Sequence, residues 1–392
     1  MQLVAYGAQD IYLTGNPQIT FFKVVYRRHT NFSMESIQQT FNGTVDFGRK
    51  ATCTIARNGD LIHHVYLQAV LPEVDAANIG GECRTRFRWL NWIGHRLIKT
   101  VDIEIGGQRI DKQYGTWLHI WNELSQTAGH KVGYANMVGN VPRLTQPVSG
   151  AVGTATGGKI PETVLYIPLQ FWFCRNPGLA LPLIALQYHE VKVKVTWGND
   201  GDNSCGINCD YIYLDTDERR RFAQVSHEYL IEQLQKEDKN TASTTHKLNF
   251  NHPVKSLYWT ITDTNRDATD TTPALNENLG DTNGNDILNY SSASENTDLG
   301  LGTYDTFNTG QLLFNGIERF IARDALYFRQ VQPYQYHSNV PKKHIDMYSF
   351  ALKPEEHQPS GTCNFSRIDN ATLNMTWGTN PTVLKVFAVN YN

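Results

Sequence analysis

The segment Val191-Lys-Val-Lys-Val-Thr-Trp-Gly198 alternates apolar and polar residues with a period of two. Successive side chains of a β-strand point to opposite faces, so this pattern predicts a strand with one buried face and one polar face. The same alternation occurs over residues 64–71, 100–105 and 257–261. One-sided strands are typical of antiparallel sandwiches and barrels, and we therefore expect an all-β protein.

The end of that segment is repeated. Thr196-Trp197-Gly198 recurs 180 residues later as Thr376-Trp377-Gly378, again after an alternating strand. Earlier in each half, residues 103–109 resemble 314–319 and residues 36–39 resemble 230–233. Matches in the same order at similar spacing indicate two copies of one β-sandwich, joined near residues 215–225. With about eight strands per copy, the repeat favours two consecutive eight-stranded jelly rolls, a double jelly roll with few short helices.

This interpretation divides the chain of 392 residues into three parts. Residues 1–31 form an N-terminal arm, residues 32–220 the first jelly roll and residues 221–392 the second. Two helices are expected, one starting at Asn16-Pro17, where an N-cap residue precedes proline, and one over 114–125.

Two segments without strand periodicity are expected to be long loops, residues 126–159 and 263–310. Residues 263–307 carry seven Asp and two Glu against Arg266 alone, a net charge of −8. Unpaired carboxylates are costly to bury, so we expect this acidic loop on the outer surface of the second jelly roll. The sequon Asn289-Tyr-Ser lies in this loop and makes Asn289 a candidate glycan site, which the charge alone does not imply.

Composition excludes several functions. The formal net charge is −3, which argues against direct binding to nucleic acid. No stretch approaches the roughly 18–20 apolar residues of a membrane span. The N-terminus does not resemble a signal peptide, and six cysteines in this length do not suggest a disulfide framework. These features together predict a chain that folds in a reducing cytoplasm.

The short motifs predict no catalytic, cofactor-binding or metal-binding residues. Gly153–Lys159 has phosphate-loop spacing but lacks the following Ser or Thr and the preceding strand. Cys205 and Cys209 lack a second ligand pair and are expected in a turn, and His63 and His64 should face opposite ways. Carboxylates are plentiful, which leaves open a jelly-roll glycan-processing enzyme. A carbohydrate-binding protein is the other alternative, with Tyr134, Tyr290, Tyr304 and Phe307 as exposed loop aromatics.

The arm places bulky apolar residues beside basic ones. Two interpretations remain open from the residues alone: a strand or helix that covers the core, or an arm that anchors this subunit to another. The residues that define the anchoring interpretation are Phe21, Phe22, Tyr26, Arg27, Arg28 and His29.

Five long blocks closely resemble major capsid proteins of nucleocytoplasmic large DNA viruses. They are YGAQDIYLTGNPQITFFKVVYRRHTNF (6–32), FNGTVDFG (41–48), RNGDLIH (57–63), LDTDERRRFAQ (214–224) and YSFALKPEEHQPSGTCNFSRID (348–369). The resemblance implies a structural subunit without catalysis or cofactors, located in the virion capsid after folding and assembly in the host cytoplasm.

The resemblance also implies partners. A double jelly roll of this family forms a homotrimer, a pseudo-hexagonal capsomer that contacts neighbouring capsomers, minor capsid proteins and penton proteins in an icosahedral shell. An internal viral membrane lies nearby, the long loops face outward and the arm lies at the inner face. Family members usually continue past residues 386–392, so the resemblance leaves the C-terminal closing contacts of this chain open.

Overall fold

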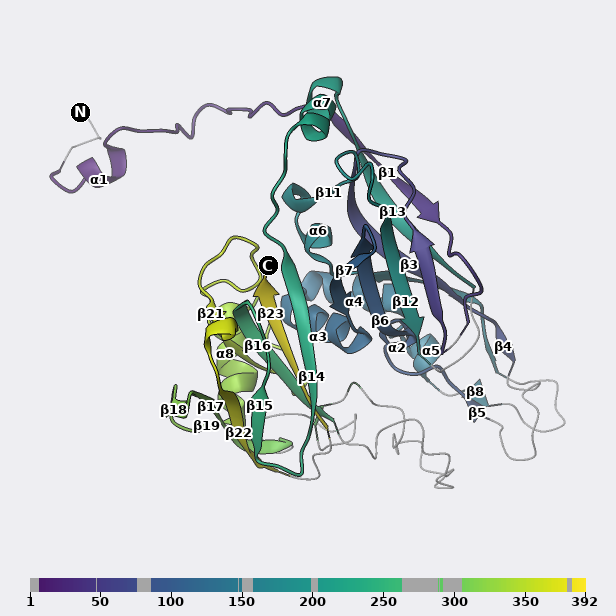
Figure 1. Ribbon diagram of the computed structural model, residues 1–392, viewed down its shortest axis with the longest axis vertical. Coiled ribbons are helices and arrows are strands. Elements are labelled where there is room, and N and C mark those ends of the chain that lie inside the picture. The colour runs from purple at the N-terminus through teal and green to yellow at the C-terminus, as the bar shows by residue number, and fades with distance from the viewer. Residues whose placement is uncertain are drawn as a thin grey trace.

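The computed structural model describes residues 7–46, 48–75, 86–146, 148–149, 158–198, 204–262, 288, 290–291, 305–378 and 383–392. Figure 1 shows two β-sandwiches and an N-terminal arm that projects from the end of the first sandwich where α7 (Thr216–Gln224) lies. Helix α7 occupies the segment in which the two repeats were expected to join, and the chain then runs along the first sandwich into the second.

The first sandwich consists of two antiparallel sheets. One has the order β1-β13-β3-β10, with β11 also paired to β3, and the other has the order β2-β12-β6-β7. The strands are β1 (Phe32–Gln39), β2 (Lys50–Thr54), β3 (Leu61–Leu71), β6 (Ile98–Ile105), β7 (Gln108–Gln113), β10 (Thr163–Pro168), β11 (Leu181–Pro182), β12 (Val191–Trp197) and β13 (Ser204–Leu214).

The second sandwich repeats this plan. Its sheets have the orders β14-β23-β16-β20 and β15-β22-β17-β18, with β21 added to β16 and β19 to β17. The strands are β14 (Glu232–Asn240), β15 (Thr245–Leu248), β16 (Pro253–Thr262), β17 (Phe307–Phe314), β18 (Ile317–Glu318), β19 (Arg323–Asp324), β20 (Asp346–Ser349), β21 (Cys363–Asn364), β22 (Ala371–Trp377) and β23 (Val383–Tyr391).

The two sandwiches have the same topology. When the eight main strands of each half are numbered along the chain, both halves read 1-8-3-6 in one sheet and 2-7-4-5 in the other. This is the strand order of a jelly roll, in which the first and last strands pair in the same sheet. The predicted double jelly roll and the internal repeat are therefore confirmed.

The repeated Thr-Trp-Gly occupies equivalent places, at the ends of β12 and β22. In both halves the partner strand has an irregular register beside the tryptophan: Trp197 pairs with Ile98 and Trp377 with Phe307. The glycine that follows the tryptophan lies against the backbone of a neighbouring segment of the same chain. A Cβ atom would lie 2.8 Å from the Arg96 carbonyl oxygen at Gly198, and 2.6 Å from the Asp305 carbonyl oxygen at Gly378. Close backbone approach explains why glycine recurs here.

The second matched pair of segments forms equivalent hairpin turns. Gly106 and Gly107 join β6 to β7 with φ of 58° and 85°, and Asn315 and Gly316 join β17 to β18 with φ of 52° and 78°. Two consecutive positive φ values are typical of a type I′ hairpin, which favours Asn and Gly. The loose sequence match between 103–109 and 314–319 thus reflects one turn geometry used twice.

The sandwiches share a packed interface through α3 (Gly115–Ser125), a helix that the sequence predicted over 114–125. Trp117 of α3 packs with its ring centroid 5.3 Å from that of Tyr258 in β16 and 5.6 Å from that of Phe387 in β23. Strand β16 is consequently buried along almost its whole length. The pattern of residues 257–261 predicts one apolar and one polar face, but both faces are buried: Trp117 of α3 packs against Tyr258, and Thr260 on the same face is also buried.

Other sequence expectations need correction. The helix predicted to start at Asn16-Pro17 instead precedes them, as α1 (Ile11–Thr14), because Asn16 has a φ of 55° and ends it. Cys205 and Cys209 lie within strand β13, where main-chain pairing with β3 replaces the expected turn. Residues 307–310, assigned to the acidic loop, begin strand β17 with Phe307 buried.

The segment 126–159 is not one long loop. It contains α4 (Ala128–Val138), whose face with Tyr134 and Val138 is buried, and α5 (Pro142–Thr145). The remaining short elements are β4 (Val74–Asp75), β5 (Arg86–Phe87), α2 (Ile93–Leu97), β8 (Val148–Ser149), β9 (Lys159–Ile160), α6 (Trp172–Arg175), η2 (Pro177–Leu179), η4 (Tyr327–Val331), α8 (Gln332–Tyr336) and η5 (Phe365–Arg367).

Candidate functional site

The anchoring residues of the arm lie on an extended segment away from both sandwiches (Figure 1). Their aromatic side chains are among the most exposed that the structure describes: Phe21 is 89% exposed, Phe22 99% and Tyr26 86%. Arg27, Arg28 and His29 are also exposed. The side chains named here cover no part of either core, so this surface is available to a partner outside the chain.

The same arm carries further unpaired apolar side chains. Between residues 11 and 26, six more large apolar residues are at least two-thirds exposed: Ile11, Tyr12, Leu13, Ile19, Val24 and Val25. Scattered exposed apolar residues are ordinary, but a contiguous set of this size is typical of an interaction site.

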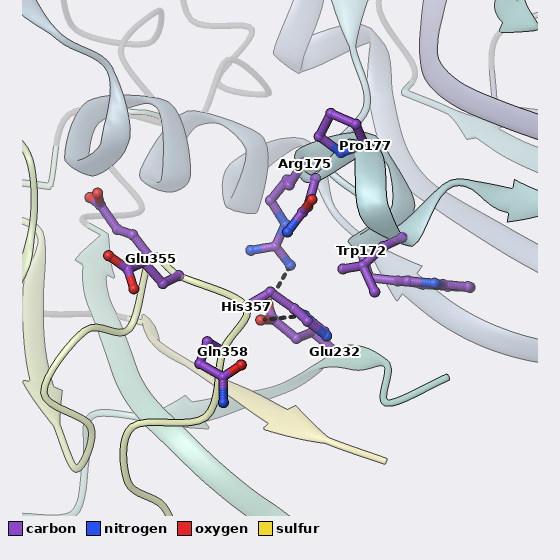
Figure 2. A pocket seen from close by; sticks show the side chains of 10 residues that line it. Trp172, Arg175, Pro177, Glu232, Glu355, His357 and Gln358 are labelled. Atoms are coloured by element: carbon purple, nitrogen blue, oxygen red, sulfur yellow. Dashed lines mark hydrogen bonds and ion pairs between the residues drawn. The ribbon is translucent and has the colours of Figure 1, made fainter. Parts of the chain in front are cut away.

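A second feature is a charged cleft of about 330 Å³ at the junction of the sandwiches. Figure 2 shows Arg175 of α6 reaching from the first sandwich toward Glu232 of β14 in the second. The Arg175 Nη2 atom lies 2.8 Å from Glu232 Oε2. The other oxygen, Oε1, lies 2.7 Å from Lys255 Nζ and 3.2 Å from His357 Nδ1.

The electrostatics of this cleft indicate a structural joint. Burial by itself would raise the pKa of Glu232, but the charge of Arg175 and the contacts with His357 and Lys255 outweigh burial and lower it to about 2. Glu355, on the other side of the cleft, has its pKa lowered despite burial, because His337 and Ser338 hydrogen-bond to its carboxylate. Neither carboxyl resembles a general acid, which needs a raised pKa. The lowered pKa values of Glu232 and Glu355 therefore argue against these two carboxyls as a glycosidase pair.

A further set of contacts joins the sandwiches at β7 and β14. The Leu234 amide donates to Asp111 Oδ1 at 3.0 Å, and Gln233 Nε2 donates to the Ile110 carbonyl oxygen at 2.5 Å. Burial raises the pKa of Asp111 to about 6, partly opposed by the Leu234 amide. Sequence reasoning missed these joints, because the partners are more than 50 residues apart and no short motif contains both.

Three of the four loop aromatics considered for carbohydrate binding, Tyr134, Tyr290 and Phe307, are buried instead. The Tyr134 hydroxyl lies 2.8 Å from His95 Nε2, and the Tyr290 hydroxyl lies 3.1 Å from His119 Nδ1. Both tyrosines are in the core with Leu288, which removes them as a sugar-stacking surface. Tyr304 lies outside the described residues.

The candidate glycan site and most of the phosphate-loop-like motif lie outside the described residues. Asn289 lies outside the described residues, although Leu288 and Tyr290 on either side of it are buried. Residues 153–157 also lie outside, and Lys159 contacts Glu73 and Asp75. Of the acidic residues of the loop, Asp305 is described, and it forms an ion pair with Arg329 at 2.5 Å and lies 3.0 Å from His344.

The histidines, cysteines and helices of the described residues give no sign of a metal site or a membrane span. There, no group of His, Cys, Asp and Glu is arranged to hold a metal ion. His63 is buried and His64 half-buried, as expected for neighbours on opposite faces of β3. The helices of the described part are all too short or too polar to cross a membrane.

Comparisons with known proteins cover both sandwiches. The family described as "Major capsid protein N-terminus" matches residues 20–216, and the family described as "Large eukaryotic DNA virus major capsid protein" matches residues 218–392. The major capsid protein of Pyramimonas orientalis virus is 53% identical, over 100% of this chain and 95% of that protein. That of Paramecium bursaria Chlorella virus 1 is 44% identical, over 96% of this chain and 87% of its own.

Solved structures of major capsid proteins have a similar fold. VP54 of PBCV-1, in a structure fitted into a reconstruction of the virophage Sputnik, is 36% identical with a TM-score of 0.78, covering 95% of this chain and 96% of its own. The Faustovirus major capsid protein has a TM-score of 0.74 at 14% identity, over 99% of this chain and 94% of its own, a likeness of fold.

Proposed function

Because the chain belongs to the family of large eukaryotic DNA virus major capsid proteins, we propose that it assembles as a trimeric, pseudo-hexagonal capsomer of an icosahedral shell. The chain is a structural capsid protein, and its homologues are structural proteins rather than enzymes. The glycan-processing and carbohydrate-binding alternatives are not supported.

One observation carries the proposal: both halves of the chain have the same jelly-roll strand order. Three chains related by a threefold axis would then present six similar sandwiches. Such an assembly has a nearly hexagonal outline and can pack in hexagonal arrays, although its true symmetry is threefold. The joint at Arg175 and Glu232 supports this arrangement, because it holds the two sandwiches of one chain in a fixed relation.

Relatives support assembly into a shell. A model of the PBCV-1 capsid contains a chain 35% identical to this one with a TM-score of 0.76, covering 95% of this chain and 96% of its own. We extend this to the present chain: its capsomers contact neighbouring capsomers, minor capsid proteins and penton proteins, above an internal membrane. Folding and assembly take place in the host cytoplasm.

We assign three parts to the subunit: the arm of residues 1–31, the first jelly roll of 32–220 and the second of 221–392. The arm anchors the subunit at the inner face of the shell through Phe21, Phe22, Tyr26, Arg27, Arg28 and His29, whose exposure supports this role. The acidic loop faces outward, a placement that its charge of −8 supports. Its glycan site is the sequon at Asn289, although Tyr290 and Ser291 of that sequon are buried in the isolated chain.

Light scattering coupled to size-exclusion chromatography tests the trimer. One chain has a mass of 44.5 kDa, so a trimer should have a mass of about 134 kDa. An interface larger than the standard ~1,600 Å² per pair should keep it intact at micromolar concentration. A stable monomer, together with no threefold capsomer in electron micrographs of assembled particles, would overturn the proposal.

A further inference from the structure

An apolar groove of about 550 Å³ lies at the same end of the subunit as the root of the arm. It is formed between α7, the segment that follows α7, and the region around β11. Its apolar lining includes Leu181, Pro182, Leu186, Phe222, Val225 and Ile231. Its polar members include His189, His227, Gln108 and Ser226, and none of the residues that line it is Asp, Glu, Lys or Arg. Such a groove suits aromatic or aliphatic side chains.

The root of the arm is fixed beside this groove. Phe32, the first residue of β1, pairs with Leu214, the last residue of β13, and α7 begins two residues after Leu214. Phe22 lies ten residues before Phe32, so an extended chain allows it to reach up to about 35 Å from the root. The arm therefore starts at the groove end of its own subunit and can span to an adjacent one.

We propose that the aromatic side chains of the arm, Phe21 and Phe22 first, dock in the α7 groove of a second copy of this chain. This inference deepens the proposed role of the arm in assembly and rests on it. In the structure the arm extends away from its own groove with its apolar residues exposed. An aromatic side chain can bury roughly 150–250 Å², and one chain carries both the unpaired aromatic residues and an unfilled apolar groove.

If the contact is repeated from one copy to the next, it holds several copies together. An arm on one copy that fills a groove on the next is a heterologous contact, and such contacts close into rings when the rotation between copies allows it. A capsomer with a threefold axis would have three arms and three grooves. The basic residues Arg27 and Arg28 lie between the aromatic anchors and the root, and they would remain outside the uncharged groove.

Cross-linking between two differently tagged, co-expressed full-length copies tests the contact. One copy carries Lys23→Cys, an exposed position beside the two docking aromatic residues of the arm, and the other carries Ala223→Cys at the exposed end of α7 that lines the groove. A short bis-maleimide should link the two tags. The matched control replaces Ala223→Cys with Ala242→Cys, an exposed alanine in the β14–β15 turn of the second sandwich. We expect several-fold more linked product with Ala223→Cys than with the control.

A blocked groove gives a second measurement. Ala185 is exposed and also lines the groove, so Ala185→Cys should capture the arm as well. Adding Ala223→Trp to that copy should abolish the link by filling the groove, whereas Ala242→Trp should leave it unchanged. Thermal unfolding of each variant shows whether it is folded.

Three results would overturn the inference. The first is equal linking to Ala223→Cys and to Ala242→Cys, and the second is no linking to either groove position. The third needs a single chain that carries both the arm cysteine and the groove cysteine: linking within that chain, without linking between copies, would show that the arm fills its own groove. Binding of anionic lipid vesicles that is lost with Phe22→Ser, in the absence of any link, would instead identify the membrane as the partner of the arm. Light scattering of the same samples separates the two proposals: trimers without links refute the groove contact alone, and links without trimers refute the capsomer.

Discussion

The guanidinium of the half-buried Arg175 lies 2.8 Å from the buried carboxylate of Glu232, and this ion pair joins the first jelly roll to the second. Arg175 also stacks over the ring of Trp121, at 4.7 Å from its centroid. Lys255 Nζ, on the far side of Glu232, donates to the Glu356 carbonyl oxygen at 2.8 Å. The joint thus links α6, α3, β14, β16 and the segment before β21 in one network.

We predict that Glu232 makes the protein sensitive to acid. The pKa of Glu232 is about 2 in the folded protein and about 4.5 as its ordinary value. A lowered carboxyl pKa contributes stability above pH 4.5, which is lost as the pH falls toward 2. The contribution at neutral pH is about 3 kcal/mol in the free energy of unfolding.

Urea unfolding of Glu232→Gln at several pH values checks this prediction. The variant should be less stable than the parent at pH 7 by about 3–5 kcal/mol, since it leaves Arg175 and Lys255 without their counter-charge. The difference should shrink between pH 4.5 and 2. Exposed Glu162→Gln is the control and should have little effect. Equal losses from both substitutions would refute the role of the joint.

Gly198→Ala and Gly378→Ala should each destabilise their own sandwich. The added Cβ would meet the carbonyl oxygen of Arg96 or Asp305 at less than 3 Å. Overpacking of this kind costs about 1–3 kcal/mol. The control is Gly133→Ala in α4, where a Cβ meets nothing within 4 Å, and helix propensity should raise stability by up to about 1 kcal/mol. Midpoints of chemical denaturation give the comparison.

His95 should cause a second loss of stability at milder acidity. Burial lowers its pKa from 6.5 to about 3, so the unfolded chain binds the proton first as the pH falls below 6.5. One such group costs roughly 2 kcal/mol of folding free energy at pH 5. In the double variant His95→Phe/Tyr134→Phe, which removes both hydrogen-bonding partners, the fall in stability between pH 7 and 5 should be smaller by about that amount.

His119 remains in that variant, and burial together with the charges of His95 and Lys343 also lowers its pKa. Part of the pH dependence should therefore persist. Thermal unfolding across this pH range measures the slope, and an unchanged slope would rule out His95 as its source.

Deletion of residues 1–31 should impair shell assembly while leaving the jelly rolls folded. Of residues 7–31, all except Asp10 are exposed, so the deletion should shift the unfolding midpoint by less than about 2 °C. Electron microscopy of particles reports assembly. Tyr188→Ser, which removes an exposed aromatic ring from the body of the first sandwich, is the control and should assemble normally. Normal particles from the deletion would show that the arm is dispensable.

Local patterns in the sequence were sufficient to predict the double jelly-roll architecture. Alternation in 191–197 placed β12, and Thr-Trp-Gly marked the same strand end in both halves. The resemblance of five blocks then indicated the capsid family. These features are readable because strand periodicity, turn chemistry and a glycine at a close approach act within a few residues along the chain.

Contacts between distant residues were decided only by the tertiary structure. Burial of Tyr258 depends on α3, which is more than 130 residues away, and the charge state of Glu232 depends on Arg175. Burial of Tyr290 likewise depends on His119 and its neighbours, not on the polar loop around it. A side chain's own pattern reports which face of its element it occupies, but what covers that face is determined by how the two jelly rolls pack together.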